Sequence, residues 1–305
     1  MEQIINAVKN LLDKDNTGHG FEHIEKVYQN AMKICDTEKD ANRDIVALAA
    51  LLHDCDDYKL FGNECAEKLI NSRRIMTDAK IGKRIQQKVC DIISTIGYSK
   101  RISGIEPKTL EGQIVSDADM LEAMGAVGVV RCLTFALARC NKYGTPLFDK
   151  NVWPVVNMSA KEYKEKDRRS DNFINHFFEK MFKLYELLLT PAGKKEGARR
   201  HEFMIIFLEQ FFEEQGCANW KAYLKNYIRR QRTSISTKAT LKRLRDAGKK
   251  LGRPVGSKKP NKLIKREAKI KEMLKNKEPK SNIAKKLKCS RSTLYRYLNT
   301  CIKKK

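Results

Sequence analysis

A histidine and an aspartate directly follow the longest apolar run of the chain. Residues 45–52 are eight consecutive apolar residues, rich in Ala and Leu, and His53 and Asp54 come next. Burial and the negative end of a helix dipole both disfavour a carboxylate at such a place. We therefore expect a positive group close to Asp54, and a metal ion would supply it most directly.

Two further segments offer matching donors. His23 lies next to Ile24 at the border of an apolar stripe. Asp117 and Asp119 precede an apolar segment, and we expect them to lie at the start of the helix that this segment forms. Two histidines with one or two aspartates suit Mn²⁺, Fe²⁺, Zn²⁺, Mg²⁺ or a similar ion. The residues alone leave other roles open, because either aspartate would also serve at a helix N-terminus and His23 as a hydrogen-bonded boundary histidine.

The elements that must position these residues are helices. Apolar residues recur at a spacing of three and four in residues 24–35, which is typical of an amphipathic helix. Glycine and proline separate the segments, and strand-like alternation is nearly absent. The sequence therefore predicts an all-α fold. Further helical patterns span residues 63–71, 83–96, 119–139, 171–189 and 194–214.

Three motifs resemble those of a known enzyme family. The segments GHGFEHIEKVYQNA (18–31), ALLHDCDDYK (50–59) and EGQIVSDADMLEAMGAVGVVR (111–131) resemble the H…HD…D motifs of HD-domain phosphohydrolases. They are most similar to small bacterial members that hydrolyse nucleotides. GTPLFD (144–149) and the segments up to residue 214 resemble later landmarks of that group. The resemblance covers about residues 1–215 and implies a helical HD-domain bundle.

The resemblance also implies a ligand set. One divalent metal ion would be held by His23, His53, Asp54 and Asp119. Asp117 would lie just outside this shell, among the residues that bind substrate. Residues 95–98 lack an additional histidine that some members carry there, so we expect a single metal ion.

Such a metal ion would hold a phosphate oxygen and activate a water molecule. Asp54 is thus both ligand and catalytic residue. Asp57 would orient or deprotonate the water if the helix continues through it, and Lys59 would pair with a substrate phosphate. A solvated surface position is the alternative for both. We expect His19, His176 and Lys180 to bind substrate, the last two from one helical face, and His201 to serve in packing.

The positive charge is confined to the end of the chain. The whole protein has 62 Lys and Arg against 37 Asp and Glu, a net charge of +25. Residues 216–305 hold 30 of these basic residues and only 4 acidic ones, so residues 1–215 are close to neutral. This division predicts a module for small molecules joined to a module for a polyanion.

Residues 280–298, KSNIAKKLKCSRSTLYRYL, have the layout of a helix-turn-helix. Ile283, Ala284 and Leu287 would face inward on the first helix, and Ser290 would cap the second. Lys288 stands where the turn usually has glycine. The stretch from about residue 236 to 298 resembles the C-terminal region of serine recombinases, the resolvases and invertases.

This second resemblance implies binding to double-stranded DNA. Arg253, in the sequence Gly-Arg-Pro, would reach the minor groove. The second helix would enter the major groove, with Ser290, Arg291, Ser292, Thr293, Tyr295 and Arg296 on or near its outer face. Nothing in residues 1–215 resembles a recombinase catalytic domain, so we do not expect strand exchange.

The expected organisation is an HD domain (1–215), a basic linker helix with an arm (216–260) and a helix-turn-helix domain (261–305). Nine scattered cysteines without a CxxC pair, no apolar run near 18 residues and no signal-peptide pattern predict a cytoplasmic protein off the membrane. The predicted function is hydrolysis of nucleotides, with release of phosphate or pyrophosphate, on a chain that binds DNA. The alternative is a DNA-binding regulator that senses a nucleotide with little turnover. A homodimer would suit the recombinase-like module.

Overall fold

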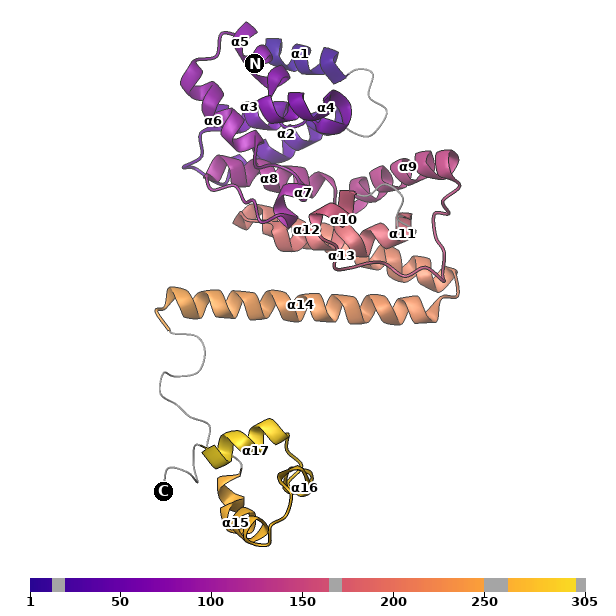
Figure 1. The fold of residues 1–305 in the computed structure, drawn as a ribbon. Coiled ribbons are helices and arrows are strands. Elements are labelled where there is room, and N and C mark those ends of the chain that lie inside the picture. Colours follow the sequence, from indigo (N-terminus) through magenta and orange to yellow (C-terminus); the bar gives the residue numbers. More distant parts are fainter. Residues whose placement is uncertain (13–19, 165–171, 250–262, 300–305) are drawn as a thin grey trace. The chain divides into compact units, whose positions relative to one another are not determined.

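The computed structural model describes residues 1–12, 20–164, 172–249 and 263–299 (Figure 1). All regular elements in these ranges are helices, which confirms the predicted all-α class. The chain divides into two compact units, Met1–Ile235 and Ser236–Lys305. The first unit carries the H…HD…D motifs and the second carries the helix-turn-helix segment.

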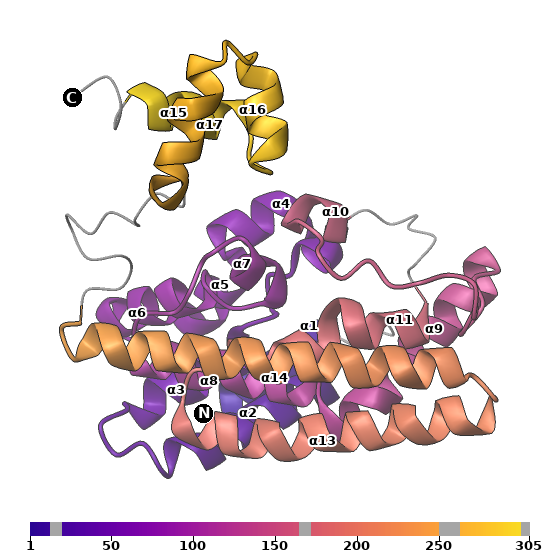
Figure 2. The ribbon, with the colours of Figure 1, turned by 90° about the horizontal axis from the view of Figure 1, so that it is seen from below.

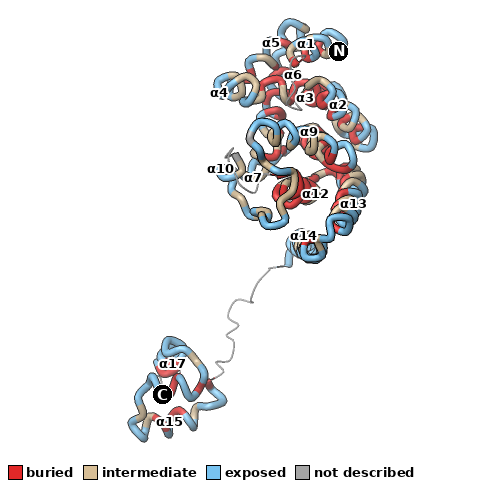
Figure 3. Tube along the Cα trace, turned by 90° about the vertical axis from the view of Figure 1, so that its right-hand side faces the viewer, coloured by how far each residue is buried: buried red, intermediate tan, exposed pale blue. Residues whose placement is uncertain are grey.

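Three helices form the centre of the first unit. α3 is buried along its whole apolar run, as its colour in Figure 3 shows, and other helices of the unit, α2 and α8 among them, pack against it. Ile24, Val27 and Ala31 line one face of α2 and pack into the same core. α8 completes the group and is buried from Ile114 through Ala118. The bounds are α2 (Phe21–Cys35), α3 (Arg43–Leu52) and α8 (Leu110–Glu122), with α1 (Glu2–Leu12) packed on α3.

The segment after α3 does not continue as a helix. α3 ends at Leu52 and the next helix begins at Tyr58, so the condition set for the role of Asp57, a helix that continues through it, is not met. Gly62, with φ of 83°, then places a kink inside α4. The outer layer consists of α4 (Tyr58–Lys68), α5 (Ile70–Asp78), α6 (Lys83–Ile93) and α7 (Tyr98–Ile102).

The segment predicted as one helix over 119–139 is two helices. α8 ends at Glu122 and α9 begins at Gly125, where the extended Met124 and the positive φ of Gly125 turn the chain. α8 begins further upstream than predicted, at Leu110. Thr109 caps its start, because its hydroxyl accepts a hydrogen bond from the Gly112 N–H. The prediction that Asp117 and Asp119 open a helix is therefore wrong, since both lie in its last turns.

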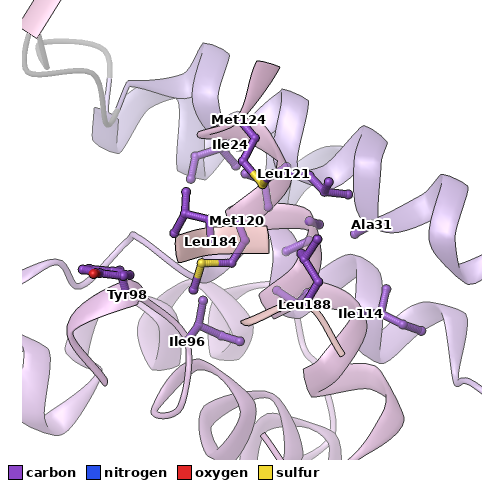
Figure 4. Close-up of a cluster of buried hydrophobic side chains, with 14 of the residues drawn as sticks. Ile24, Ala31, Ile96, Tyr98, Ile114, Met120, Leu121, Met124, Leu184 and Leu188 are labelled. Atoms are coloured by element: carbon purple, nitrogen blue, oxygen red, sulfur yellow. The ribbon is translucent and has the colours of Figure 1, made fainter. Parts of the chain in front are cut away.

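The remaining helices cover the other side of α8. In Figure 4, Leu184 and Leu188 lie with Met120 and Leu121 in one buried cluster. The segment predicted as a single helix over 171–189 contains a π-helical turn in its middle. The bounds are α9 (Gly125–Tyr143), α10 (Ala160–Lys164), α11 (Phe173–His176), the π-helix η1 (Phe177–Met181), α12 (Phe182–Leu187) and α13 (Pro191–Glu214).

The long basic helix α14 (Ala218–Asp246) belongs in part to the first unit. Trp220, Leu224, Ile228 and Gln231 recur at a spacing of three and four and are buried. Gln231 accepts a hydrogen bond from His201 of α13, and Figure 2 shows the two helices side by side. This apolar stripe explains why the first unit reaches Ile235.

The second unit has its own small core. Ile270, Ile283, Ala284 and Leu294 are buried at the junction of three helices, as the helix-turn-helix pattern predicts. Ser290 accepts a hydrogen bond from the Thr293 N–H at 3.1 Å, which confirms the predicted cap. The elements are η2 (Ile264–Arg266), α15 (Glu267–Lys275), α16 (Lys280–Lys286) and α17 (Arg291–Tyr297).

Lys288 occupies the turn between α16 and α17 with φ of 50°. A lysine in this left-handed conformation costs about 1 kcal/mol relative to glycine. The turn forms nevertheless, because Leu287 and Leu294 on either side are buried in the same core.

In the part of the chain that the structure describes, no single helix is long and apolar enough to cross a membrane, and the bent pair α8 and α9 passes that test only jointly.

Candidate metal centre

Three helices bring two histidines and two aspartates to one point. His23 lies in the first turn of α2, His53 and Asp54 follow the end of α3, and Asp119 lies in the last turns of α8. The two imidazole Nε2 atoms are 3.3 Å apart. Asp54 Oδ2 is 3.4 Å from His23 Nε2 and 3.7 Å from His53 Nε2. Asp119 Oδ1 is 3.8 and 4.0 Å from the same two nitrogens.

The histidines form the floor of this centre and the carboxylates its rim. Both histidines are buried, whereas the side chains of Asp54 and Asp119 are 18% and 22% exposed. The position of Asp54 after a buried helix is the one that the sequence marks as unfavourable for a lone carboxylate. The cluster thus presents nitrogen and oxygen donors that a small ligand can reach from the carboxylate side.

Each imidazole has an oxygen atom close to Nδ1, on the far side of the ring from the centre. His53 Nδ1 is 2.8 Å from the carbonyl oxygen of Ala50. A carbonyl only accepts, so His53 carries its proton on Nδ1 and turns the lone pair of Nε2 toward His23. His23 Nδ1 is 3.1 Å from Oε2 of Glu122, which is buried and also pairs with Arg131. The sequence analysis missed Glu122, although it lies one helical turn after Asp119.

The donor set fits a divalent metal ion. Two nitrogens and two carboxylates are the ligands that first-row divalent metals accept, and no thiolate is involved. Metal bonds of about 2.0–2.2 Å place neighbouring ligand atoms roughly 3.0–3.5 Å apart. His23, His53 and Asp54 have spacings of 3.3 to 3.7 Å and form a compact group of candidate ligands.

A lysine adds positive charge near the carboxylates. Lys180 lies half-buried on η1, with its ammonium 5.6 Å from the centre of the Tyr98 ring. Burial lowers the pKa of Lys180 and Arg131 lowers it further, whereas Asp119 and Asp54 oppose this shift. A π-helical turn is uncommon in proteins and often marks a functional site. His176, one turn earlier, lines a pocket between α9 and α11 together with Arg139 and Phe173.

Asp117 makes its contacts with the chain itself. Its carboxylate accepts hydrogen bonds from the N–H groups of Leu189 and Thr190 and from the Thr190 hydroxyl. Burial raises its pKa, against the effect of these hydrogen bonds. These contacts join α8 to the start of α13.

Two other predicted residues lie at the start of α4. Asp57 caps this helix, because its carboxylate accepts a hydrogen bond from the Lys59 N–H at 2.8 Å. Lys59 is exposed and its ammonium is 5.9 Å from the centre of the Tyr58 ring. His201 is buried against Gln231, in keeping with a packing role. His19 lies outside the described residues.

The second unit carries the predicted DNA-binding residues on α17. Their side chains are exposed, and Tyr295 is covered on one side by the Lys280 ammonium at 5.1 Å. Arg253 lies outside the described residues. The exposed residues are Ser290, Arg291, Ser292, Thr293, Tyr295 and Arg296 in this order along the cap and helix.

Comparison with known proteins agrees with this geometry. Residues 20–124 match the HD domain. The chain is 31% identical over 216 residues to the Bacillus subtilis protein YpgQ. The match covers 68% of this chain and 90% of YpgQ. The chain belongs to the HD-domain family. Residues 260–300 match the helix-turn-helix domain of resolvase, so both resemblances expected from the sequence are confirmed.

Solved structures show the same HD-domain fold. A Lactobacillus plantarum protein is 30% identical with a TM-score of 0.59, and the match covers 70% of this chain and 95% of that one. An HD-superfamily hydrolase from Bacillus thuringiensis is 30% identical with a TM-score of 0.53, covering 70% and 96%. YpgQ in complex with ADP is 28% identical with a TM-score of 0.53, again covering 70% and 96%. The first unit therefore has the fold of HD-superfamily hydrolases.

Proposed function

We propose that the protein is a metal-dependent phosphohydrolase of free nucleotides that carries its own DNA-binding module. The observation that carries this proposal is the convergence of His23, His53, Asp54 and Asp119 from three helices. Their donor atoms and spacing suit one divalent metal ion, and one related solved structure, from Bacillus thuringiensis, is of an HD-superfamily hydrolase. A divalent ion bound there would supply a Lewis acid and an activated water.

Two observations support a nucleotide as substrate. The related protein YpgQ has been crystallised with ADP. In addition, the near-neutral composition of residues 1–215 lacks the basic track that a nucleic-acid polymer requires. A free nucleotide needs only a few positive groups for its phosphates.

Lys180 is the residue that we assign to the substrate phosphate. It lies near enough to Asp54 and Asp119 for their charges to act on its ammonium, and its own charge would offset that of an incoming anion. Cys132, which also lies near Lys180, lines the pocket beside His176. The apolar walls of that pocket would take the part of the nucleotide that carries no phosphate.

Asp54 and Asp119 line the side from which a water molecule would reach the phosphorus atom. Their partly exposed carboxylates are able to accept hydrogen bonds from that water and orient it. Asp57 and Lys59 stay predictions for this step. The capping bond of Asp57 already uses one of its carboxylate oxygens. Lys59 is exposed, whereas the charges of Asp54 and Asp119 act on Lys180, so we favour Lys180 over Lys59 as the phosphate contact.

The second unit is proposed to bind double-stranded DNA. It combines a resolvase-type helix-turn-helix with most of the net positive charge of the chain. Phosphate contacts by lysine and arginine dominate such binding. The hydrolase would thereby be held close to DNA while acting on small nucleotides.

The deciding experiment measures metal content and product release on the full-length protein. Nucleoside mono-, di- and triphosphates are tested with Mn²⁺, Mg²⁺, Zn²⁺ and Fe²⁺, and phosphate and pyrophosphate are assayed separately. We expect turnover of at least one nucleotide and loss of both metal and turnover in Asp54→Ala. Nucleotide binding without turnover, accompanied by altered DNA affinity, would instead identify a regulator.

A further inference from the structure

Glu122 lies behind the metal centre and is almost completely buried. Its Oε2 atom is 3.1 Å from Nδ1 of His23, and the two side chains are 2% and 3% exposed. Arg131, on α9, pairs with the same carboxylate oxygen. Glu122 follows Asp119 by three residues on α8, so both face α2, one toward each ring nitrogen of His23.

The charge of this pair decides which nitrogen of His23 carries the proton. A buried carboxylate without a partner would be strongly destabilising, and the guanidinium of Arg131 offsets its charge. An ionised carboxylate accepts hydrogen bonds and donates none. Its charge, 3.1 Å from Nδ1, favours the form of His23 with the proton on Nδ1 and the lone pair on Nε2.

The same arrangement holds for the other imidazole, with a weaker partner. His53 donates from Nδ1 to the neutral carbonyl of Ala50. Both Nε2 lone pairs therefore point into the space between the rings, where the nitrogens are 3.3 Å apart. Two acceptors at that distance repel each other unless a cation lies between them, so the polar contacts at the two Nδ1 atoms prepare the centre for a metal ion.

We propose that Glu122 is a positioning residue of the metal centre. It holds His23 as the Nδ1–H tautomer with Nε2 directed at the metal, and the negative charge makes Nε2 a stronger donor. Arg131 keeps the carboxylate charged and in place. This inference rests on the proposed function, because it concerns a ligand of the same metal.

A purely structural ion pair between α8 and α9 is the competing explanation. If the pair only joined the helices, removing either partner would have the same effect on the protein. A positioning role predicts an asymmetry instead, since only Glu122 contacts His23. The matched comparison is therefore Glu122→Gln against Arg131→Gln.

The experiment measures Mn²⁺ binding to the full-length protein by titration calorimetry. Glu122→Gln is expected to weaken Mn²⁺ binding by about 10–100-fold, the usual effect of losing such an outer partner. Arg131→Gln should weaken Mn²⁺ binding clearly less, although it leaves the buried carboxylate without its partner and should lower the melting temperature without metal. If Glu122→Gln alone does not fold, the double variant Glu122→Gln/Arg131→Gln removes both charges of the pair and should show the same loss of Mn²⁺ binding.

A second readout reports the tautomer without metal. Long-range ¹H–¹⁵N NMR spectra should show His23 of the wild type protonated on Nδ1, with assignment by His23→Gln, and a changed pattern in Glu122→Gln. Unchanged Mn²⁺ affinity and an unchanged His23 tautomer in Glu122→Gln would overturn this inference and leave the proposed function standing. A wild type that binds no divalent metal would overturn the proposed function and this inference with it.

Discussion

Asp117 holds the first turn of α13 through Thr190, which donates to its carboxylate from both the backbone N–H and the hydroxyl, each at 2.7 Å. The Thr190 hydroxyl in turn accepts from the N–H of Gly193 and so caps the helix. This buried junction joins α13 to α8 two residues before the candidate ligand Asp119.

Gly193→Ala is expected to weaken this junction. A Cβ atom at residue 193 would lie 2.3 Å from Asp117 Oδ2 and 2.8 Å from the Thr190 hydroxyl oxygen. Overpacking of this kind costs about 1–3 kcal/mol. Urea unfolding should show that loss in the free energy of unfolding. Gly82→Ala is the matched control, because a Cβ there meets open space; equal stability of the two variants would contradict the prediction.

The stability of the first unit should fall as the pH drops below about 6.5, in part through His201. Burial lowers the pKa of His201 in the folded protein, although its hydrogen bond to Gln231 opposes this. At pH values between the ordinary histidine pKa of about 6.5 and the lowered pKa of the folded protein, His201 is therefore protonated in the unfolded chain but not in the folded protein. His201 stabilises fully above this window, and that stability is lost as the pH falls through it.

The test compares the pH dependence of unfolding in wild type and His201→Gln. One such proton changes the free energy of unfolding by up to about 1.4 kcal/mol per pH unit. Denaturant titrations at pH 7.5, 6.5 and 5.5 should show a shallower loss in His201→Gln. A variant that loses stability as steeply as the wild type would show that other groups account for the acid sensitivity.

Lys180→Gln should impair the use of substrate while leaving the metal in place. The charges of Asp54 and Asp119 act on Lys180 of η1, and Lys59 is an exposed residue of α4. If Lys180 contacts the substrate phosphate, its loss should lower kcat/KM by about 10–100-fold, in part through a higher KM. This is the effect expected when one hydrogen bond to a charged group is lost. Lys59→Gln is the matched control and should change kcat/KM less than threefold. The reverse order would restore the assignment of Lys59 to the phosphate.

The residues of the candidate metal centre could be predicted from the sequence more completely than the boundaries of the helices that hold them. His23, His53, Asp54 and Asp119 were predicted from their motifs, and the structure brings them together. The break between α8 and α9 was missed, because apolar residues continue across it and only the backbone of Gly125 marks the turn. Pairing across helices, as in Glu122 with His23, depends on tertiary packing and leaves no local pattern.

The end of the first unit was harder to predict for a similar reason. The basic residues of α14 dominate its composition and hide the stripe of Trp220, Leu224 and Ile228 that packs on the core. A chain ending at residue 235 should therefore fold and hydrolyse nucleotides like the full-length protein. A chain ending at residue 215 would expose the aromatic surface around Phe178, which contacts Trp220, and should aggregate or melt at a lower temperature. Circular dichroism and the phosphate-release assay compare the two.

Residues 236–305 are expected to bind duplex DNA without the HD domain. α17 presents Arg291 and Arg296 on its exposed side, while Leu294 and Tyr297 hold it in the core of the second unit. Most of the affinity should come from phosphate contacts, so it should fall by orders of magnitude between low and moderate salt if about six or more phosphates are neutralised. Gel-shift titrations at two salt concentrations measure this directly.

The two arginines on α17 allow a sharper test of how that DNA is read. An arginine that contacts a guanine edge in the major groove contributes about 1–3 kcal/mol of discrimination between bases. Arg291→Ala or Arg296→Ala should therefore weaken a preferred site, chosen by selection from random duplexes, more than it weakens random DNA. Lys269→Ala, which removes an exposed charge on α15, should weaken both to the same extent. If neither arginine variant distinguishes the selected site from random DNA, α17 binds phosphates and does not read bases; absence of binding even at low salt would contradict the DNA-binding assignment itself.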